Sequence, residues 1–249
     1  MMKYYYLLEI LYQGFNYHGW QKQPGISTVQ GALENAIKNA FVDINEIQTM
    51  AASRTDSMVS ALQNYVLLIL DKKIDESLFL SEVKEKLPLD IKIKEIKEVD
   101  SSFRIIGAFK RKIYHYTFSY KFMPAEFDKT SMVFFEEDLD LEKIKAGIEY
   151  FIGTHSFHNF CHKDRVDKFT KTIYRMELVE SQKRGIYRFE IEGDSFMRHQ
   201  IRLMIGSLLK VGMGQMGLDE LKAALDINNH KREVFLTPAL GLSLIKLIP

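Results

Sequence analysis

The sequence predicts an α+β protein of two ferredoxin-like halves, each a split β-α-β unit whose antiparallel sheet is flanked by helices. Two observations support this fold class. Apolar periodicity follows the order β-α-β-β-α-β in the first half of the chain, and the same order recurs in the second half. The chain has 249 residues, 46% of them hydrophobic, which is enough to bury a core. A central cleft between two such halves is a natural place for a site.

The N-terminal half, residues 1–103, contains four predicted strands and two predicted helices. Ser27 and Gln30 form a capping-box pattern, which predicts that the first helix begins there and continues with apolar residues at helical spacing to Phe41. Pro88 predicts the end of the second helix, Glu76–Leu87. The strands of this half are expected at Lys3–Tyr12, 47–53, 63–71 and Ile91–Val99.

The C-terminal half, residues 104–249, repeats this order of elements without a repeat at the level of sequence. Its main helices are expected at Leu141–Ile152, stopped by Gly153, and at Phe196–Val211, with a short extra helix at Leu218–Leu225. The strands are expected at Lys112–Tyr120, Thr172–Glu180, Ile186–Glu192 and Leu242–Leu247.

Composition and charge narrow the functional classes. No segment has the pattern of a secretion signal or a membrane span, and the single cysteine, Cys161, allows no internal disulfide, so a cytoplasmic protein is expected. The net charge is only +1, but basic residues gather locally. They can form a positive face for phosphates or belong to a mixed-charge, solvated surface. The basic patches comprise Arg104, Lys110–Lys112, Lys163, Arg165, Lys168, Lys171 and Arg175. The compensating acidic cluster comprises Glu136–Asp138, Asp140 and Glu142.

The triplet Arg54-Thr55-Asp56 lies between two predicted strands, in a loop where side chains can converge on a cleft. A neighbouring arginine keeps a partly buried carboxylate ionised, and such a carboxylate can act as a nucleophile or base. On the triplet alone, a structural ion pair that caps the following turn is the favoured interpretation.

Six ordered sequence pieces extend this observation over nearly the whole chain. They are N-Y-H-G-W-Q-K-Q (16–23), V-Q-G-A-L-E (29–34), S-R-T-D (53–56), R-K-I-Y-H-Y (111–116), G-T-H-S-F (153–157) and F-M-R-H-Q-I-R-L-M-I-G (196–206). In this order and spacing they resemble the TruA-type tRNA pseudouridine synthases. The resemblance departs from the family pattern at Ser53, where glycine is usual.

The resemblance implies an activity and a set of site residues. Asp56 matches the catalytic aspartate, and Arg54 matches the arginine that pairs with it and takes part in base flipping. Tyr114 matches the tyrosine whose ring lies against the target base, and Arg202 matches the arginine that forms a salt bridge with the carboxylate. The family uses no metal and no cofactor, forms homodimers and isomerises uridine in tRNA, usually in the anticodon stem-loop.

These residue types suit the implied chemistry, although alternatives remain. A carboxylate can attack either C1′ of the ribose or C6 of the uracil, and the flipped base needs an aromatic surface. The alternative function is a non-catalytic RNA-binding or tRNA-folding module on the same scaffold. A metal-dependent hydrolase is a third class.

Other patterns have simpler interpretations. Gly212, Gly214 and Gly217 satisfy G-x-G-x-x-G but follow a helix, so a helix C-terminus is predicted instead. The cluster of His155, His158, Cys161 and His162 has no standard zinc spacing, and a structural or RNA-facing loop is predicted there. The aromatic residues Tyr17, His18 and Trp20 can stack on RNA or pack over the first sheet. His199 is not assigned to the site, because a histidine on a helix surface is usually unremarkable.

Overall fold

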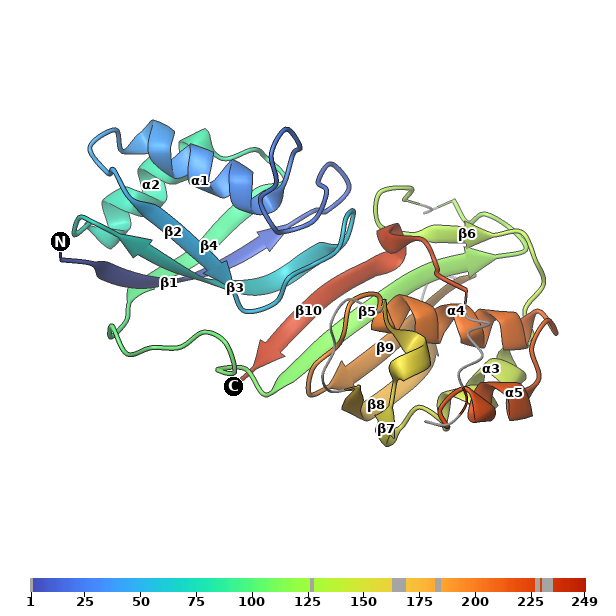
Figure 1. The fold of residues 1–249 in the computed structure, drawn as a ribbon. Helices are drawn as coiled ribbons and strands as arrows, with labels where there is room; N and C mark the ends of the chain where they lie inside the picture. The colour runs from blue at the N-terminus through green and yellow to red at the C-terminus, as the bar shows by residue number, and fades with distance from the viewer. Residues whose placement is uncertain (1, 126–127, 163–168, 182–184, 227–228, 230–234) are drawn as a thin grey trace. The chain divides into compact units, whose positions relative to one another are not determined.

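The computed structural model describes residues 2–125, 128–162, 169–181, 185–226, 229 and 235–249 (Figure 1). The chain forms two compact units. The first contains residues 1–110 and 243–249, and the second contains residues 111–242. The last strand, β10 (Leu242–Ile248), therefore has all but its first residue in the N-terminal unit. Each unit is an α+β structure, so the predicted fold class is confirmed.

The N-terminal unit is a mainly antiparallel sheet with two helices over one face (Figure 1). Strand β1 lies between β3 and β4 and pairs with both in antiparallel register. The other edge of β3 pairs with β2, antiparallel, and with β10, parallel, at Ser243–Ser60. The elements in chain order are β1 (Tyr4–Tyr12), α1 (Val29–Ala40), β2 (Ile47–Ala51), β3 (Ser60–Leu70), α2 (Glu76–Lys86) and β4 (Ile91–Glu98). The predicted β-α-β-β-α-β order is confirmed.

The starts of both helices in this unit follow from short polar side chains. The hydroxyl of Thr28 accepts a hydrogen bond from the Gly31 amide (3.2 Å), so the predicted cap at Ser27 is wrong by one residue. In α2, the Asp75 carboxylate caps the Leu78 amide (2.8 Å). The buried face of α1 contains Val29, Leu33, Ala36 and Ile37, and that of α2 contains Phe79 and Val83. These residues cover the sheet and form the helical side of the core of the unit.

The second unit is also a helix-covered sheet, in which β9 lies between β5 and β8, and β7 pairs with the outer edge of β8. Its strands are β5 (Arg111–Tyr120), β6 (Val133–Phe135), β7 (Gly153–Ser156), β8 (Thr170–Glu180) and β9 (Ile186–Gly193). Its helices are α3 (Leu141–Ile148), α4 (Gln200–Gly212) and α5 (Leu218–Ala223), with 3₁₀ turns at His158–Phe160 and Ala239–Gly241.

Two helix boundaries in this unit differ from prediction by four residues. Helix α3 ends at Ile148, four residues early, and α4 begins at Gln200, four residues late. Before α4, His199 adopts a left-handed backbone (φ 64°), and the Gln200 side chain accepts a hydrogen bond from the Met197 amide (2.9 Å). These features prevent the helix from extending back to Phe196, although its residues have suitable apolar spacing.

Candidate active site

The triplet Arg54-Thr55-Asp56 forms the turn between β2 and β3, as predicted from the sequence. Arg54 is exposed, Thr55 is buried and Asp56 is half-buried. Three residues on, Val59 begins the return to the core, and Met58 has a left-handed backbone (φ 65°). A non-glycine residue in this conformation is uncommon, and such strain often marks a functional turn.

Buried polar side chains hold this turn from the sheet below. The hydroxyls of Tyr12 and Thr55 share a hydrogen bond of 2.8 Å. The fully buried Asn64 side chain donates to the Ser53 carbonyl (2.8 Å) and accepts from the Ser53 amide (3.3 Å). Burial also raises the pKa of Tyr12 to about 12, so its hydroxyl stays protonated at neutral pH. The chain before Asp56 is thus held at Ser53, through its backbone, and at Thr55, through its side chain.

The departure at Ser53 fits this arrangement. Its side chain is 4% exposed, and both of its backbone groups bind Asn64. The Ser53 backbone is not in the left-handed conformation that only glycine accepts easily. Among the described non-glycine residues of this turn, only Met58 has a positive φ. Serine therefore replaces the usual glycine without backbone strain at this position.

Tyr114 lies on β5 in the second unit and is 6% exposed. It faces Ile191 of β9 in the sheet register. The ring of Phe196 packs against it edge to face, with centroids 5.3 Å apart and an interplanar angle of 82°. This contact comes from the segment that precedes α4, so the packing restrains the orientation of the tyrosine ring.

Arg202 lies in the first turns of α4 and is half-buried. Its Nε donates a hydrogen bond to the Thr237 carbonyl (2.8 Å), and the Thr237 hydroxyl donates to the Arg202 carbonyl (3.2 Å). The next residue, Pro238, accepts a hydrogen bond from the Tyr116 hydroxyl (3.1 Å). These bonds attach segment 237–238 to both α4 and β5, and they fix one side of the guanidinium group.

Lys112 is on the same face of β5 as Tyr114, because alternate residues of a strand share a face. Burial lowers the pKa of Lys112, and the positive charge of Lys171 lowers it further. Neighbouring Arg111 is exposed, pairs with Glu192 (3.1 Å) and lies over the Tyr174 ring at 4.8 Å. This end of the second unit therefore carries basic groups close to Tyr114.

The other charged groups are more evenly balanced. The predicted basic residues Lys163, Arg165 and Lys168 lie outside the described residues. Most of the acidic cluster is paired with lysines, through Lys121–Asp138 (3.0 Å), Lys143–Asp140 (3.2 Å) and Lys145–Glu142 (2.7 Å). Those acids therefore belong to a mixed-charge surface.

The predicted site residues divide between the two units. Arg54 and Asp56 belong to the N-terminal unit, and Tyr114 and Arg202 belong to the second. Sequence reasoning missed Asn64 and Phe196 as supporting residues. An asparagine inside the apolar run of β3 is a detectable signal for the first. No sequence pattern identifies the second, because its role depends on the packing of two aromatic rings.

The glycines at the end of α4 and the histidines near β7 have structural roles. Gly212 ends α4 and Gly214 follows in a left-handed conformation (φ 71°), which confirms a helix C-terminus. The ring nitrogens of His155 and His158 form hydrogen bonds with the carbonyls of Ile152 (2.8 Å) and Asn229 (2.9 Å). In the described part of the chain, no three His, Cys, Asp or Glu side chains are grouped as metal ligands.

The aromatic loop packs into its own unit. Trp20 is 1% exposed and Tyr17 is 5% exposed, and the Tyr17 hydroxyl donates to Asp90 (2.6 Å). Of the three aromatic residues that sequence reasoning selected, His18 is exposed. The packed-loop interpretation is therefore correct for the other two. Across the described residues, no helix is both long and apolar enough to cross a bilayer.

Comparison with known proteins identifies the family. A family profile described as tRNA pseudouridine synthase matches residues 10–106 and 148–248. Two relatives, both named tRNA pseudouridine synthase A, come from Acetivibrio thermocellus and Clostridium kluyveri. Each is 35% identical to this chain over 240 residues, which cover 96% of this chain and 97% of the relative. A relative of the same name from Phytoplasma mali is 32% identical and covers 99% of both chains.

These matches define the class as pseudouridine synthase. The chain belongs to the tRNA pseudouridine synthase family, and its similarity to relatives of that name extends over nearly its full length. The resemblance predicted from the six sequence pieces is confirmed.

Proposed function

We propose that this protein isomerises uridine in the anticodon stem-loop of tRNA, with Asp56 as the nucleophile. The enzyme class follows from family membership: the chain is an isomerase that converts uridine to pseudouridine in tRNA. The observation that carries the residue assignment is the position of Asp56 in a turn that is fixed at Ser53 and Thr55. A nucleophile must be held in a near-attack geometry, and a fixed turn supplies it.

The reaction breaks the bond between N1 of uracil and C1′ of ribose, turns the base and forms a bond between C5 and C1′. The proton on C5 is released, and N1 gains a proton. In one route the Asp56 carboxylate attacks C1′ and leaves when C5 bonds to that carbon. In the other it attacks C6 and is expelled after the base has been transferred. Both routes need an ionised carboxylate beside the ribose and the base.

The other three residues receive their roles from the same chemistry. Arg54 is exposed next to Asp56 and has the length to occupy the gap that a flipped base leaves. Tyr114 supplies a ring whose orientation is restrained by Phe196, and the target base would lie against it. Arg202, whose Nε donates to the Thr237 carbonyl, would pair its guanidinium charge with the carboxylate.

The direct test is to incubate unmodified tRNA transcripts with the protein and map pseudouridine along each transcript. Wild type should convert uridines in the anticodon stem-loop, and Asp56→Asn should convert none while it still binds tRNA. If wild type and Asp56→Asn both bind tRNA and leave every uridine unchanged, the enzyme assignment is wrong, and an RNA-binding or tRNA-folding module becomes the correct description.

The quaternary structure and location belong to the same proposal. We expect a cytoplasmic homodimer, in which two chains build one tRNA-binding surface. Sedimentation at the working concentration of the assay would detect a dimer of this 29.0 kDa chain. A monomer that remains active would remove the dimer from the proposal and leave the chemistry of Asp56 unaffected.

A further inference from the structure

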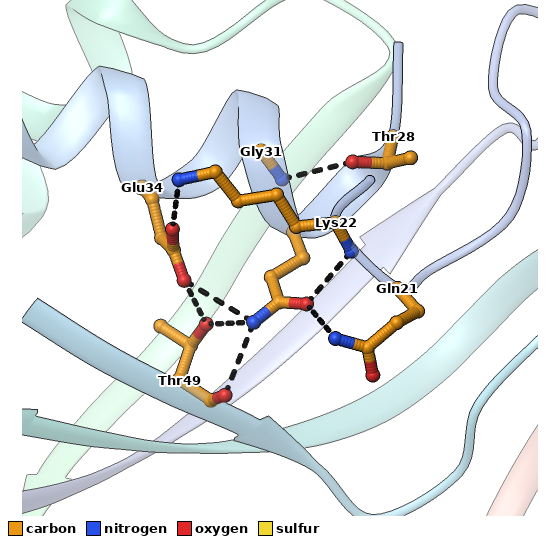
Figure 2. Close-up of polar contacts among 7 residues, drawn as sticks. Gln21, Lys22, Thr28, Gly31, Glu34 and Thr49 are labelled. Carbon is orange, nitrogen blue, oxygen red and sulfur yellow. Dashed lines mark hydrogen bonds and ion pairs between the residues drawn. The ribbon is translucent and has the colours of Figure 1, made fainter. Parts of the chain in front are cut away.

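We infer that Gly19, acting with a partly buried polar network that joins its loop to α1 and β2, is a positioning element for the Asp56 turn. The polar network consists of Lys22, Gln30, Glu34 and Thr49 (Figure 2). None of these residues is assigned to the reacting atoms. The inference rests on the proposed function, because it concerns the placement of the carboxylate that the proposal makes the nucleophile.

Gly19 approaches the turn closely enough that no side chain fits between them. Its backbone is left-handed (φ 88°), a conformation that L side chains rarely adopt. A Cβ at this position would lie 2.7 Å from the Thr55 carbonyl oxygen and 3.0 Å from the Asp56 carbonyl carbon. Both contacts are with backbone, so the Asp56 turn itself would have to move.

Backbone hydrogen bonds continue from this contact into α1. The Trp20 amide donates to the Thr55 carbonyl (3.1 Å). The Gly19 carbonyl accepts from the Val29 amide (3.1 Å), and the Trp20 carbonyl accepts from the Gln30 amide (3.0 Å). On the other side of the turn, the Met58 amide donates to the Tyr17 carbonyl (2.9 Å). The loop thus holds the turn on both sides of Asp56 and is itself attached to the start of a helix.

The polar network attaches the same loop to the strand that leads into the turn (Figure 2). Glu34 is 7% exposed, and its carboxylate accepts from Lys22 Nζ (2.7 Å), the Thr49 hydroxyl (2.7 Å) and Gln30 Nε2 (3.2 Å). Gln30 Oε1 accepts from the Lys22 amide (2.9 Å) and from Gln21 Nε2 (2.9 Å). Thr49 lies on β2, so the network joins this strand, α1 and the loop.

A buried, hydrogen-bonded carboxylate is a costly way to join three elements, because apolar packing of similar volume is often at least as stable. Its advantage is geometric, since each hydrogen bond has a defined direction and length. A displacement of about 1 Å at a catalytic group can reduce a rate about 100-fold. The network therefore acts on the reaction through the position of the Asp56 backbone.

The test compares two glycines of the same loop. Gly25 also has a left-handed backbone (φ 75°), but a Cβ there would meet nothing within 4 Å. Gly19→Ala and Gly25→Ala therefore introduce the same methyl group under similar backbone strain, and only the first pushes on Thr55. Each variant is assayed for the single-turnover rate of pseudouridine formation at saturating tRNA, for the Kd of tRNA and for Tm.

We expect Gly19→Ala to lower the single-turnover rate about 100-fold, which corresponds to a displacement of about 1 Å, with a tRNA Kd within about 3-fold of wild type. Gly25→Ala should lower Tm but keep the rate within about 3-fold of wild type. A loss of rate in Gly19→Ala that is matched by Gly25→Ala, or a loss that lies entirely in Kd, would contradict the positioning role.

A second pair of variants decides the question if Gly19→Ala does not fold. Thr49→Val keeps the shape of the side chain and removes the hydroxyl that donates to Glu34, whereas Thr49→Ser keeps that hydroxyl. We expect Thr49→Val to lower the single-turnover rate about 10-fold at unchanged Kd, and Thr49→Ser to restore it to within about 2-fold. Equal rates for the two variants would overturn the role of the polar network.

The outcomes separate the two proposals. If wild type is active, Asp56→Asn is inactive, and the Gly19 and Thr49 variants match their controls, then the positioning inference is wrong and the proposed function stands. If wild type converts no uridine, the proposed function is wrong, and the inference that rests on it is wrong as well.

Discussion

The Asp56 turn and the Tyr114–Arg202 region are held by different kinds of interaction. In the N-terminal unit, backbone and buried polar groups fix the chain on both sides of Asp56, through Asn64, Trp20 and Tyr17. In the second unit, ring packing restrains Tyr114, and a side-chain hydrogen bond to the Thr237 carbonyl holds Arg202. The difference fits the proposed roles, since a nucleophile needs a fixed backbone, whereas a base platform and a charge partner need a fixed side-chain direction.

The largest effect in this comparison is expected from the ring of Tyr114. Tyr114→Leu should lower the single-turnover rate about 10- to 100-fold, because base–aromatic stacking is worth about 1–3 kcal/mol. Tyr114→Phe keeps the ring and its contact with Phe196, and serves as the control. Rates are measured at saturating tRNA. If Tyr114→Leu and Tyr114→Phe reduce the rate equally, the ring is not the platform for the base. The direction of the Tyr114 side chain would then not matter for the reaction.

The next effect, on the free energy of unfolding, is expected at Asn64. Asn64→Leu removes the side-chain amide that donates to the Ser53 carbonyl and accepts from the Ser53 amide, and the loss of these two buried bonds should cost about 1–3 kcal/mol. Leu62→Ala on the same strand is the control, since that side chain is 58% exposed and should change stability by less than about 0.5 kcal/mol. Urea unfolding measures both.

The Asn64 prediction also sharpens the comparison between the units. Because Asn64 holds the chain immediately before Arg54, its replacement should reduce the rate as well as the stability. An Asn64→Leu protein that is destabilised but fully active at low temperature would show that the backbone of the turn does not need this support.

The smallest expected effect is the pH dependence that His115 gives to the second unit. Burial lowers the pKa of His115, and the charge of Arg188 lowers it further, while Glu190 partly opposes this. A histidine with a lowered folded-state pKa gains its proton first in the unfolded chain, so stability falls as pH decreases below about 6.5. Solvent screens part of this effect, and the loss should stay below about 1 kcal/mol.

The variant His115→Gln tests this effect, because glutamine does not titrate. Its Tm should fall less steeply than that of wild type between pH 7 and pH 5, in a difference of about 2–4 °C at most. Parallel Tm curves for wild type and His115→Gln would exclude His115 as a source of the acid sensitivity.

The sequence predicted the main strands and helices because each contains enough residues to establish a period. Strand β6 has three residues and β7 has four, too few to establish an alternation, and both were missed. The start of α4 was placed too early, because the left-handed backbone of His199 leaves no mark on apolar spacing. The cap of α1 was displaced by one residue because Ser27 and Thr28 are both suitable capping residues.

The part of the candidate site that depends on local sequence was predictable, and the part that depends on long-range contacts was not. The position of Arg54-Thr55-Asp56 between two strands follows from local sequence patterns. The contact that holds the triplet does not, because Trp20 and Thr55 are 35 positions apart and join through backbone atoms. Backbone groups are the same in every residue, so a bond between them has no signature in residue types. Gly19 gives an indirect signal, since glycine permits close approach of two chain segments.

The most direct measurement of the central claim is the release of tritium from tRNA that carries tritium on C5 of its uridines. Because the new glycosidic bond forms at C5, each isomerisation releases one C5 hydrogen to water. Wild type should release tritium in a single turnover, and Asp56→Asn should release none while it binds the same tRNA. Release by Asp56→Asn at the wild-type rate would contradict the assignment of this carboxylate as the nucleophile.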